Sequence, residues 1–304
     1  MTPVGFIGCG HMGSAMAQRL IDGGFDVVIH DIDPARVAAL TAHGARAMKS
    51  AHAVADTAPV ILTCLPSEDA SRSVAAEVAK GSAAKIYVET STIGQDHLHA
   101  IEAMLEKRGI AVLDMPVTGG PSWAREGRLT GLLAGAPAAR EAASPVLNCI
   151  ASRLIVVGDH AGQGQTAKVV NNMLSLSGML IACEAIVAGV SAGISADKLL
   201  EAINAGTGRN SATVDKFPKA ILPRTFNFGG PIGLGNKDIA LFLDLIGSDD
   251  RAHLVSPAVA ALWRRITDEL GFNADLSEMV KFFERRAGVE VRGEPDATPA
   301  SRTT

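Results

Sequence analysis

The sequence predicts an α/β Rossmann domain, built on a doubly wound and mostly parallel sheet, followed by an all-α domain with a long helix at the junction. Up to about residue 158, short β-type runs alternate with helical ones, which is typical of a doubly wound sheet. After Gly162 the β signals stop and the remaining periodic segments are helical. A chain of 304 residues is long enough for two domains with separate cores.

The first βαβ unit occupies residues 4–31. The apolar run Val4–Ile7 leads into the glycine motif GCGHMG at 8–13, which opens a helix, and a second apolar run, Val27–Ile29, ends just before Asp31. In such a motif the glycines permit a tight turn, a close approach of backbone to a pyrophosphate, and close packing of helix on strand. The pyrophosphate would lie on the unpaired N–H groups of the helix. Asp31 would accept hydrogen bonds from the adenosine ribose and repel a 2′-phosphate, which predicts a preference for NAD. NADP remains the alternative, because Arg36 lies five residues further on.

The rest of the first domain continues the alternation. We expect strands at 60–65, 86–89, 111–113, 132–134 and 154–157, with helices near 68–79, 96–108 and 138–150. Ligands of such sheets collect at the carboxyl ends of the strands. The segments Leu65-Pro66, Glu89–Thr92 and Asp114–Pro116 follow strands and are expected at that edge.

The second domain is expected to begin with a helix of about 27 residues, from roughly 167 to 193, followed by helices at 196–205, 238–246, 257–270 and 277–287. We expect residues 1–163 to bind NAD and residues 164–292 to serve substrate binding and oligomerisation. The proline-rich, polar tail at 293–304 is expected to be disordered.

The long helix is unusually apolar. Met173–Val190 has nearly the composition of a membrane span, but Glu184 and two serines interrupt it and no aromatic or basic anchors flank it. A helix buried at a domain or subunit interface is therefore favoured, since one stripe of a surface helix needs fewer apolar positions. We expect a homodimer or homotetramer.

Composition excludes several classes of function. The net charge of −4 gives no broad attraction for nucleic acid or acidic membranes. The start of the chain shows no basic leader, so a cytoplasmic location is expected. The four cysteines lie far apart and the eight histidines are scattered, which predicts reduced thiols and no metal site.

Two segments offer acid–base and anion-binding chemistry. Lys168 and Asn172 are four residues apart and share a helix face, and a lysine near a positive helix N-terminus is electrostatically unusual. From the residues alone, a solvated surface lysine is an equally good interpretation. The Thr118-Gly119-Gly120 turn offers backbone N–H groups to a carboxylate, with an ordinary glycine turn as the alternative.

At this point the chain resembles the β-hydroxyacid dehydrogenases, the group of 3-hydroxyisobutyrate dehydrogenase and tartronate semialdehyde reductase. The resemblance rests on motifs in the family's order: Gly8–Gly13 with Met16-Ala17, Leu65-Pro66, Ser91-Thr92-Ile93, Asp114–Gly120 with Ala124 and Gly127–Thr130, Gly162–Asn172, and Lys237-Asp238.

The resemblance implies an NAD-dependent oxidoreductase that transfers a hydride between nicotinamide and a small 3-hydroxy acid or its semialdehyde, a carboxylate substrate. It implies that Lys168 is the general acid/base, that Asn172 orients the substrate, and that Thr118, Gly119 and Gly120 hold its carboxylate. Trp123 and Asn171 are further expected substrate-binding residues. The expected cofactor-binding residues are Gly8, Gly10, His11, Met12, Gly13, Asp31, Leu65, Pro66, Ser91, Thr92 and Lys237.

The sequence departs from the family at two of these positions, because Thr118 stands where serine is usual and Trp123 where glycine is usual. Both changes are expected to reshape the substrate pocket. An imine reductase and a non-catalytic nucleotide-binding regulator on the same scaffold are the alternatives. Lys168 disfavours the imine reductases, which typically lack the catalytic lysine.

Overall fold

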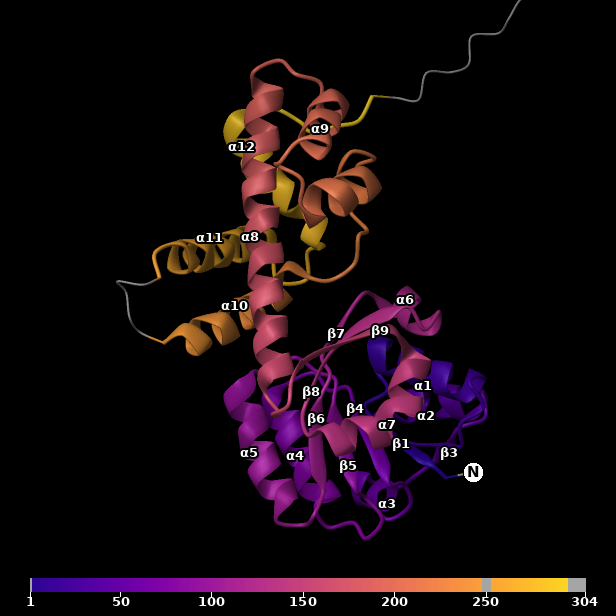
Figure 1. Cartoon of the computed structure of the whole chain (residues 1–304). Coiled ribbons are helices and arrows are strands. Elements are labelled where there is room, and N and C mark those ends of the chain that lie inside the picture. Colours follow the sequence, from indigo (N-terminus) through magenta and orange to yellow (C-terminus); the bar gives the residue numbers. More distant parts are fainter. Residues whose placement is uncertain (1, 248–252, 295–304) are drawn as a thin grey trace, which may run out of the picture. The chain divides into compact units, whose positions relative to one another are not determined.

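The computed structural model describes residues 2–247 and 253–294. The chain divides into two compact units, and the division falls within one helix, between Val169 and Val170 (Figure 1). Of the tail expected at 293–304, the structure describes residues 293 and 294, and residues 295–304 lie outside the described part of the chain. The backbone N–H groups of Gly293 and Glu294 donate to Leu222 and Asp197.

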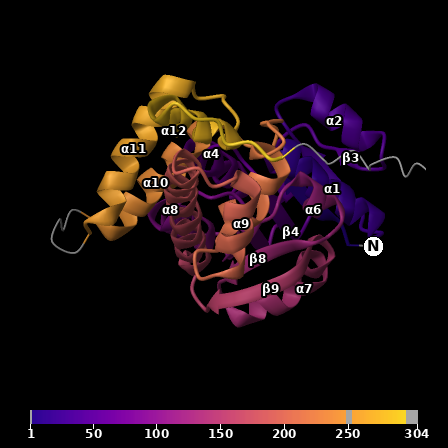
Figure 2. The same cartoon turned by 90° about the horizontal axis from the view of Figure 1, so that it is seen from above.

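The first unit is built on a sheet of nine strands. They are β1 (Val4–Ile7), β2 (Val27–His30), β3 (Arg46–Ala47), β4 (Val60–Thr63), β5 (Ile86–Glu89), β6 (Ala111–Asp114), β7 (Val117–Thr118), β8 (Leu129–Ala134) and β9 (Ala151–Gly158). Their order is β3-β2-β1-β4-β5-β6-β8-β7, and β9 pairs with β8. The pairs from β3 to β6 are parallel, whereas β8 runs antiparallel to β6 and β7. Figure 2 shows β8 and β9 side by side, with α7 next to β9.

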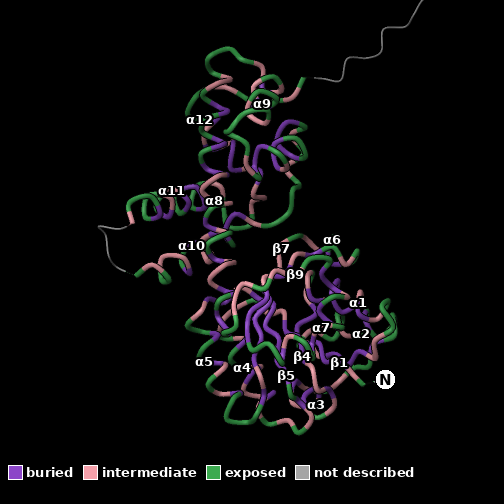
Figure 3. Tube along the Cα trace, in the orientation of Figure 1, coloured by how far each residue is buried: buried purple, intermediate pink, exposed green. Residues whose placement is uncertain are grey.

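Helices cover both faces of this sheet. They are α1 (His11–Asp22), α2 (Pro34–Thr41), α3 (Ala51–Ala55), α4 (Glu68–Val78), α5 (Gln95–Glu106), α6 (Pro121–Arg125) and α7 (Pro137–Ile150). One buried apolar cluster joins the sheet to α1, α2, α6 and α7, and a second joins it to α3, α4 and α5. Because the central strands are covered on both sides, they are continuous apolar runs, which appear as the buried centre of this unit in Figure 3.

Three neighbouring strands end on buried polar side chains. In the register of the sheet Thr63 lies opposite Glu89, and Glu89 lies opposite Asp114, and all three are fully buried. This edge is where the carboxyl ends of β4, β5 and β6 meet, and ligands of such sheets collect at that edge.

The second unit is helical. Its elements are the later part of α8 (Gln163–Ser191), α9 (Ala196–Ala205), the π-helix η1 (Ala212–Ile221), α10 (Ile232–Ile246), α11 (Val255–Leu270), the 3₁₀-helix η2 (Leu276–Met279) and α12 (Val280–Ala287). Trp263 lies at the centre of its core, fully buried, and its indole N–H donates to the carbonyl of Ile232 at 3.0 Å. The predicted fold class is confirmed.

Among the described residues, α8 is long and apolar enough to cross a membrane by length and composition alone. The core helix of a soluble protein meets the same criterion, and part of α8 is buried in the core of the second unit.

Candidate functional site

The glycine turn after β1 forms an anion cradle. Gly8 has a φ of +90°, and a Cβ there would lie 2.3 Å from the carbonyl oxygen of Cys64. A Cβ on Gly13 would lie 1.9 Å from the carbonyl oxygen of Gly8, so this position also requires glycine. Gly10 is the N-cap of α1, and within the described chain no side chain caps the helix and no acid lies in its first turn. The backbone N–H groups of the first turn of α1, from His11 and Met12 onward, can therefore bind an anion, which fits a dinucleotide pyrophosphate.

Asp31 lies at the tip of β2, beside this turn. Its nearly buried carboxylate accepts the N–H of Cys9 at 2.6 Å and the N–H of Asp33 at 2.8 Å. Each carboxylate oxygen has a second lone pair, so acceptor capacity remains for a ribose hydroxyl. The guanidinium of Arg36 lies 3.8 Å from Asp31 and 3.3 Å from Asp33. The tip of β2 therefore combines an acid suited to a ribose with a cation suited to a phosphate.

An open groove of about 510 Å³ runs along this tip. It is lined by residues of β2, α2 and β3 and the loops beside them: His30, Asp31, Ile32, Pro34, Val37, Ala38, Thr41, Ala47, Met48 and Lys49. Asp31 lines this groove and also contacts the glycine turn through Cys9. Lys168 does not line the groove.

The loops after β4 and β5 are joined to each other. The N–H of Leu65, which precedes Pro66, donates to Oγ of Ser91 at 2.7 Å, and Thr92 follows Ser91. The buried carboxylate of Glu89 accepts the N–H of Ser91 at 2.9 Å and the hydroxyl of Tyr87 at 3.1 Å. Burial raises the pKa of Glu89 above its usual value. The structure thus brings together two of the predicted cofactor segments.

The sequence places Glu89 in the segment 89–92 at the ligand-binding edge without giving it a role, and in the structure its carboxylate accepts the N–H of Ser91. The available signal was an acid closing an apolar strand two residues before a predicted cofactor serine. Its partners Tyr87 and Ser91 lie two residues away on either side, whereas the bond from Leu65 to Ser91 depends on the pairing of β4 with β5, which no local pattern states.

The predicted carboxylate-binding turn follows β6. Thr118 lies in β7 opposite Thr130 of β8, and Gly119 has a φ of +127°, which favours glycine. A Cβ on Gly119 would lie 3.2 Å from the indole of Trp123. Gly120 is the N-cap of α6, and in the described structure no side chain caps this helix. The backbone donors of the turn are therefore flanked by Trp123.

Trp123 lies on the first unit as a half-exposed side chain. It is 44% exposed, and the guanidinium of Arg128 lies over its ring, 5.0 Å from the centroid. The indole thus lies against the Gly119 turn and also makes a cation–π contact with Arg128.

The predicted catalytic residues lie on α8. Lys168 belongs to the first unit, one turn after Gln165, whereas Asn171 and Asn172 belong to the second unit. The amide of Asn171 donates to the side-chain oxygen of Asn172 at 3.3 Å, and Asn172 donates to Asp238 of α10 at 2.8 Å.

Asp238 also lies 3.8 Å from the ammonium of Lys237, so it contacts two predicted site residues, Asn172 and Lys237. In the sequence it stands only as the second residue of a Lys-Asp pair. Its contact with Asn172, 66 residues away, depends on the packing of α10 on α8.

Comparison with known proteins agrees with these features. Residues 3–158 match the family model of the NAD-binding domain of 6-phosphogluconate dehydrogenase. Residues 162–283 match the model described as NAD-binding of NADP-dependent 3-hydroxyisobutyrate dehydrogenase.

Two curated relatives match over nearly the whole chain. The 2-(hydroxymethyl)glutarate dehydrogenase of Eubacterium barkeri is 32% identical over 295 residues, which covers 95% of this chain and 97% of that one. The mitochondrial 3-hydroxyisobutyrate dehydrogenase of Rattus norvegicus is 30% identical over 294 residues, which covers 92% and 87%.

Among solved structures, the 3-hydroxyisobutyrate dehydrogenase of Mycobacterium tuberculosis, determined with L-serine, has a TM-score of 0.86 at 28% identity and covers 93% of this chain and 99% of its own. Solved imine reductases share the fold alone, at 17–19% identity. The motifs, the two matched models and the full-length relatives agree, and the chain belongs to the β-hydroxyacid dehydrogenase family of NAD(P)-dependent oxidoreductases.

Proposed function

We propose that this protein is an NAD-dependent dehydrogenase of a small 3-hydroxy acid or its semialdehyde, with Lys168 as the general acid/base. The observation that carries the proposal is the uncapped glycine turn on α1 together with a lysine near the start of α8 in the same compact unit. When bound, NAD supplies or accepts the hydride. The activities of the curated relatives support a hydroxy acid substrate.

The chain's own residues then have distinct tasks. In reduction Lys168 donates a proton to the carbonyl oxygen, and in oxidation it removes the proton of the hydroxyl. The backbone donors at Thr118, Gly119 and Gly120 hold the substrate carboxylate. By the resemblance, Asn172 orients the substrate, Asn171 lies beside it, and Lys237 serves the cofactor.

The substitution Lys168→Ala tests this assignment. General acid–base catalysis contributes roughly 10²–10⁴-fold in rate, so kcat should fall by that factor and lose a limb of its pH profile. NADH affinity should remain unchanged, because the cradle on α1 is intact. Lys168→Arg should rescue little, since a guanidinium does not release its proton at neutral pH.

Lys107→Ala, at an exposed lysine after α5, is the control and should keep wild-type kcat. A kcat for Lys168→Ala above about a tenth of wild type, short of the expected range, would refute the acid/base role. A loss confined to KM would instead make Lys168 a clamp for the substrate carboxylate.

Four finer features belong to the same proposal. The enzyme prefers NAD to NADP, acts in the cytoplasm, and forms a homodimer or homotetramer. Residues 1–163 bind the cofactor, and 164–292 provide the substrate and subunit contacts. A panel of 3-hydroxy acids and C3–C5 semialdehydes, assayed with both cofactors, identifies the substrate and separates the enzyme from an imine reductase or a non-catalytic regulator.

A further inference from the structure

The start of α8 is held by a buried carboxylate from the sheet. Asp114, at the end of β6, is fully buried, and its carboxylate accepts the N–H of Gly162 at 3.0 Å and the N–H of Gln165 at 2.7 Å. A Cβ on Gly164 would lie 2.6 Å from the same carboxylate, so the helix backbone approaches it closely. Burial raises the pKa of Asp114 to about 6, although the backbone donors act to lower it. The group is therefore ionised at neutral pH.

A second buried side chain binds the same turn to the loop after β5. Gln165 is fully buried, and its side-chain oxygen accepts the N–H groups of Ile93 at 2.9 Å and Gly94 at 3.2 Å. Its amide group donates to the carbonyl of Ser91 at 2.9 Å. The carboxylate thus fixes the backbone of the turn, and the glutamine fixes its rotation relative to the sheet edge.

We propose that Asp114 and Gln165 are positioning residues that set the register of the first turns of α8 and thereby the place of Lys168. This inference rests on the acid/base role of Lys168, which lies three residues after Gln165 on the adjoining turn. We call the two side chains the Asp114–Gln165 anchor.

The chemistry of the anchor favours this role over simple stabilisation. An exposed serine or asparagine satisfies a helix N-terminus adequately. A buried carboxylate carries a desolvation cost and adds little net stability, but it fixes one arrangement because every alternative leaves it unpaired. Proton transfer needs such a fixed arrangement, since a misplacement of about 1 Å can lower the rate about 10²-fold.

Asp114→Asn and Gln165→Met test the anchor. The asparagine keeps the shape of Asp114 but turns an NH₂ group toward backbone donors, and the methionine keeps the length of Gln165 without its three hydrogen bonds. We expect kcat to fall about 10- to 100-fold, with NADH affinity unchanged. Asp56→Asn is the matched control, because this exposed carboxylate accepts two hydrogen bonds from Ser82 and should not affect kcat.

A double-mutant cycle separates positioning from a general effect on the fold. If Asp114 acts through Lys168, adding Asp114→Asn to Lys168→Ala should leave the residual kcat unchanged, because the positioned group is already absent. Losses that multiply in the double variant would overturn the proposal. So would wild-type kcat in both Asp114→Asn and Gln165→Met.

Hydrogen exchange gives a readout that does not depend on turnover. The amides of Gly162 and Gln165 should exchange faster in Asp114→Asn than in the wild type, because they lose an ionised acceptor. Equal protection in the two proteins would show that the carboxylate does not hold the turn. If Lys168→Ala keeps its activity while this protection is lost in Asp114→Asn, the acid/base assignment fails but the anchor itself is present.

Discussion

At the scale of single residues, cofactor choice depends on the balance between Asp31 and Arg36. Asp31 is held rigidly by two backbone N–H groups, whereas the side chain of Arg36 is 49% exposed and ion-paired with two acids. The nearly buried carboxylate is the stronger determinant, because two backbone N–H groups hold it beside the glycine turn. The position of Asp31 therefore supports a preference for NAD, and Arg36 is the cation that could bind the 2′-phosphate of NADP.

Removing the charge of Asp31 should shift this preference. Asp31→Asn keeps an acceptor oxygen but no longer repels a 2′-phosphate. Two charges 4 Å apart interact by about 1 kcal/mol in water and about 4 kcal/mol near a protein surface, so kcat/KM for NADP relative to NAD should rise at least about fivefold. Arg36→Ala should change the ratio in the opposite direction. Wild-type preference for NADP, or an unchanged ratio in Asp31→Asn, would contradict this account.

Trp123 is the residue expected to determine substrate size. It lies against the Gly119 turn, whose donors are proposed to hold the substrate carboxylate. Trp123→Gly should change the ranking of kcat/KM among substrates that differ in their third-carbon substituents, because it removes the largest side chain beside that turn. Trp123→Phe keeps a ring and should preserve the ranking. The same ranking in Trp123→Gly would leave Trp123 as a packing residue only.

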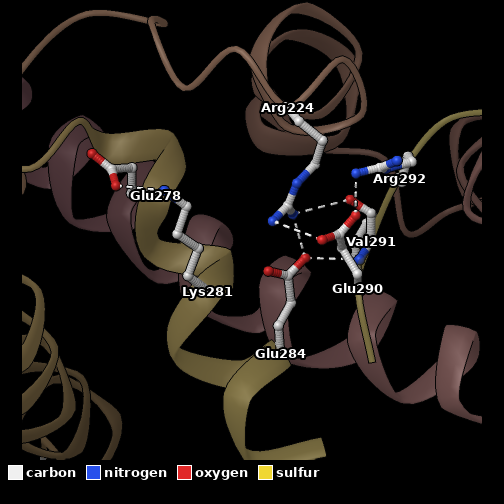
Figure 4. A network of polar contacts seen from close by, with 7 residues as sticks. All are labelled: Arg224, Glu278, Lys281, Glu284, Glu290, Val291 and Arg292. Atoms are coloured by element: carbon white, nitrogen blue, oxygen red, sulfur yellow. Dashed lines mark hydrogen bonds and ion pairs between the residues drawn. The ribbon is translucent and has the colours of Figure 1, made fainter. Parts of the chain in front are cut away.

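At the scale of elements, the segment after α12 is joined to the second unit by an ion pair whose carboxylate is buried. Arg224 donates to the carboxylate of Glu284 at 2.5 Å and to the carbonyl of Val291 at 3.3 Å (Figure 4). Glu284 in turn accepts the N–H of Val291 at 2.7 Å, and both Glu284 and Val291 are buried. The pair thus connects the end of η1, the helix α12 and the segment that follows it.

Breaking this pair should destabilise the second unit. Arg224→Met leaves Glu284 as a buried charge without its cation, which typically costs about 3–5 kcal/mol of unfolding free energy. Urea unfolding, followed by the fluorescence of Trp263 in a Trp123→Phe background, measures the loss. Lys198→Met removes an exposed pair with Glu201 and should leave the transition in place. Equal midpoints for the two variants would show that the network contributes nothing.

At the scale of the whole molecule, the outward face of α8 supports self-association. Val170, Leu174 and Ile181 are 39%, 71% and 58% exposed, and Leu174 and Ile181 lie seven residues apart on one side of the helix. Spacing by two turns makes them one apolar surface, which a homodimer would bury.

Charge placed on this face should prevent association. The wild type should scatter light at micromolar concentration as a dimer or tetramer, and Leu174→Lys with Ile181→Lys should reduce the mass to that of one chain. Val156→Lys introduces charge at a comparably exposed apolar residue of β9 and should leave the mass unchanged. A monomeric wild type would exclude the assembly.

The sequence by itself determined the features whose signal is local. The glycine turn, Asp31 and the first βαβ unit lie within 31 residues, and α9 begins and ends where its pattern predicts. The short helices α2, α3 and α6 lack enough turns for a periodic signal, and η1 contains Pro218, which reads as a helix breaker, so the sequence did not predict them.

Only the tertiary structure decided the contacts between strand ends. The long helix starts at Gln163, earlier than predicted, because its first turn is capped by Asp114, 51 residues from Gln165 in sequence. Ser91 accepts the N–H of Leu65 for the same reason, since the order of the sheet makes β4 and β5 neighbours. The partners of a buried polar side chain at a strand end depend on which strands are neighbours in the sheet. Local periodicity in the sequence does not show the order of the strands.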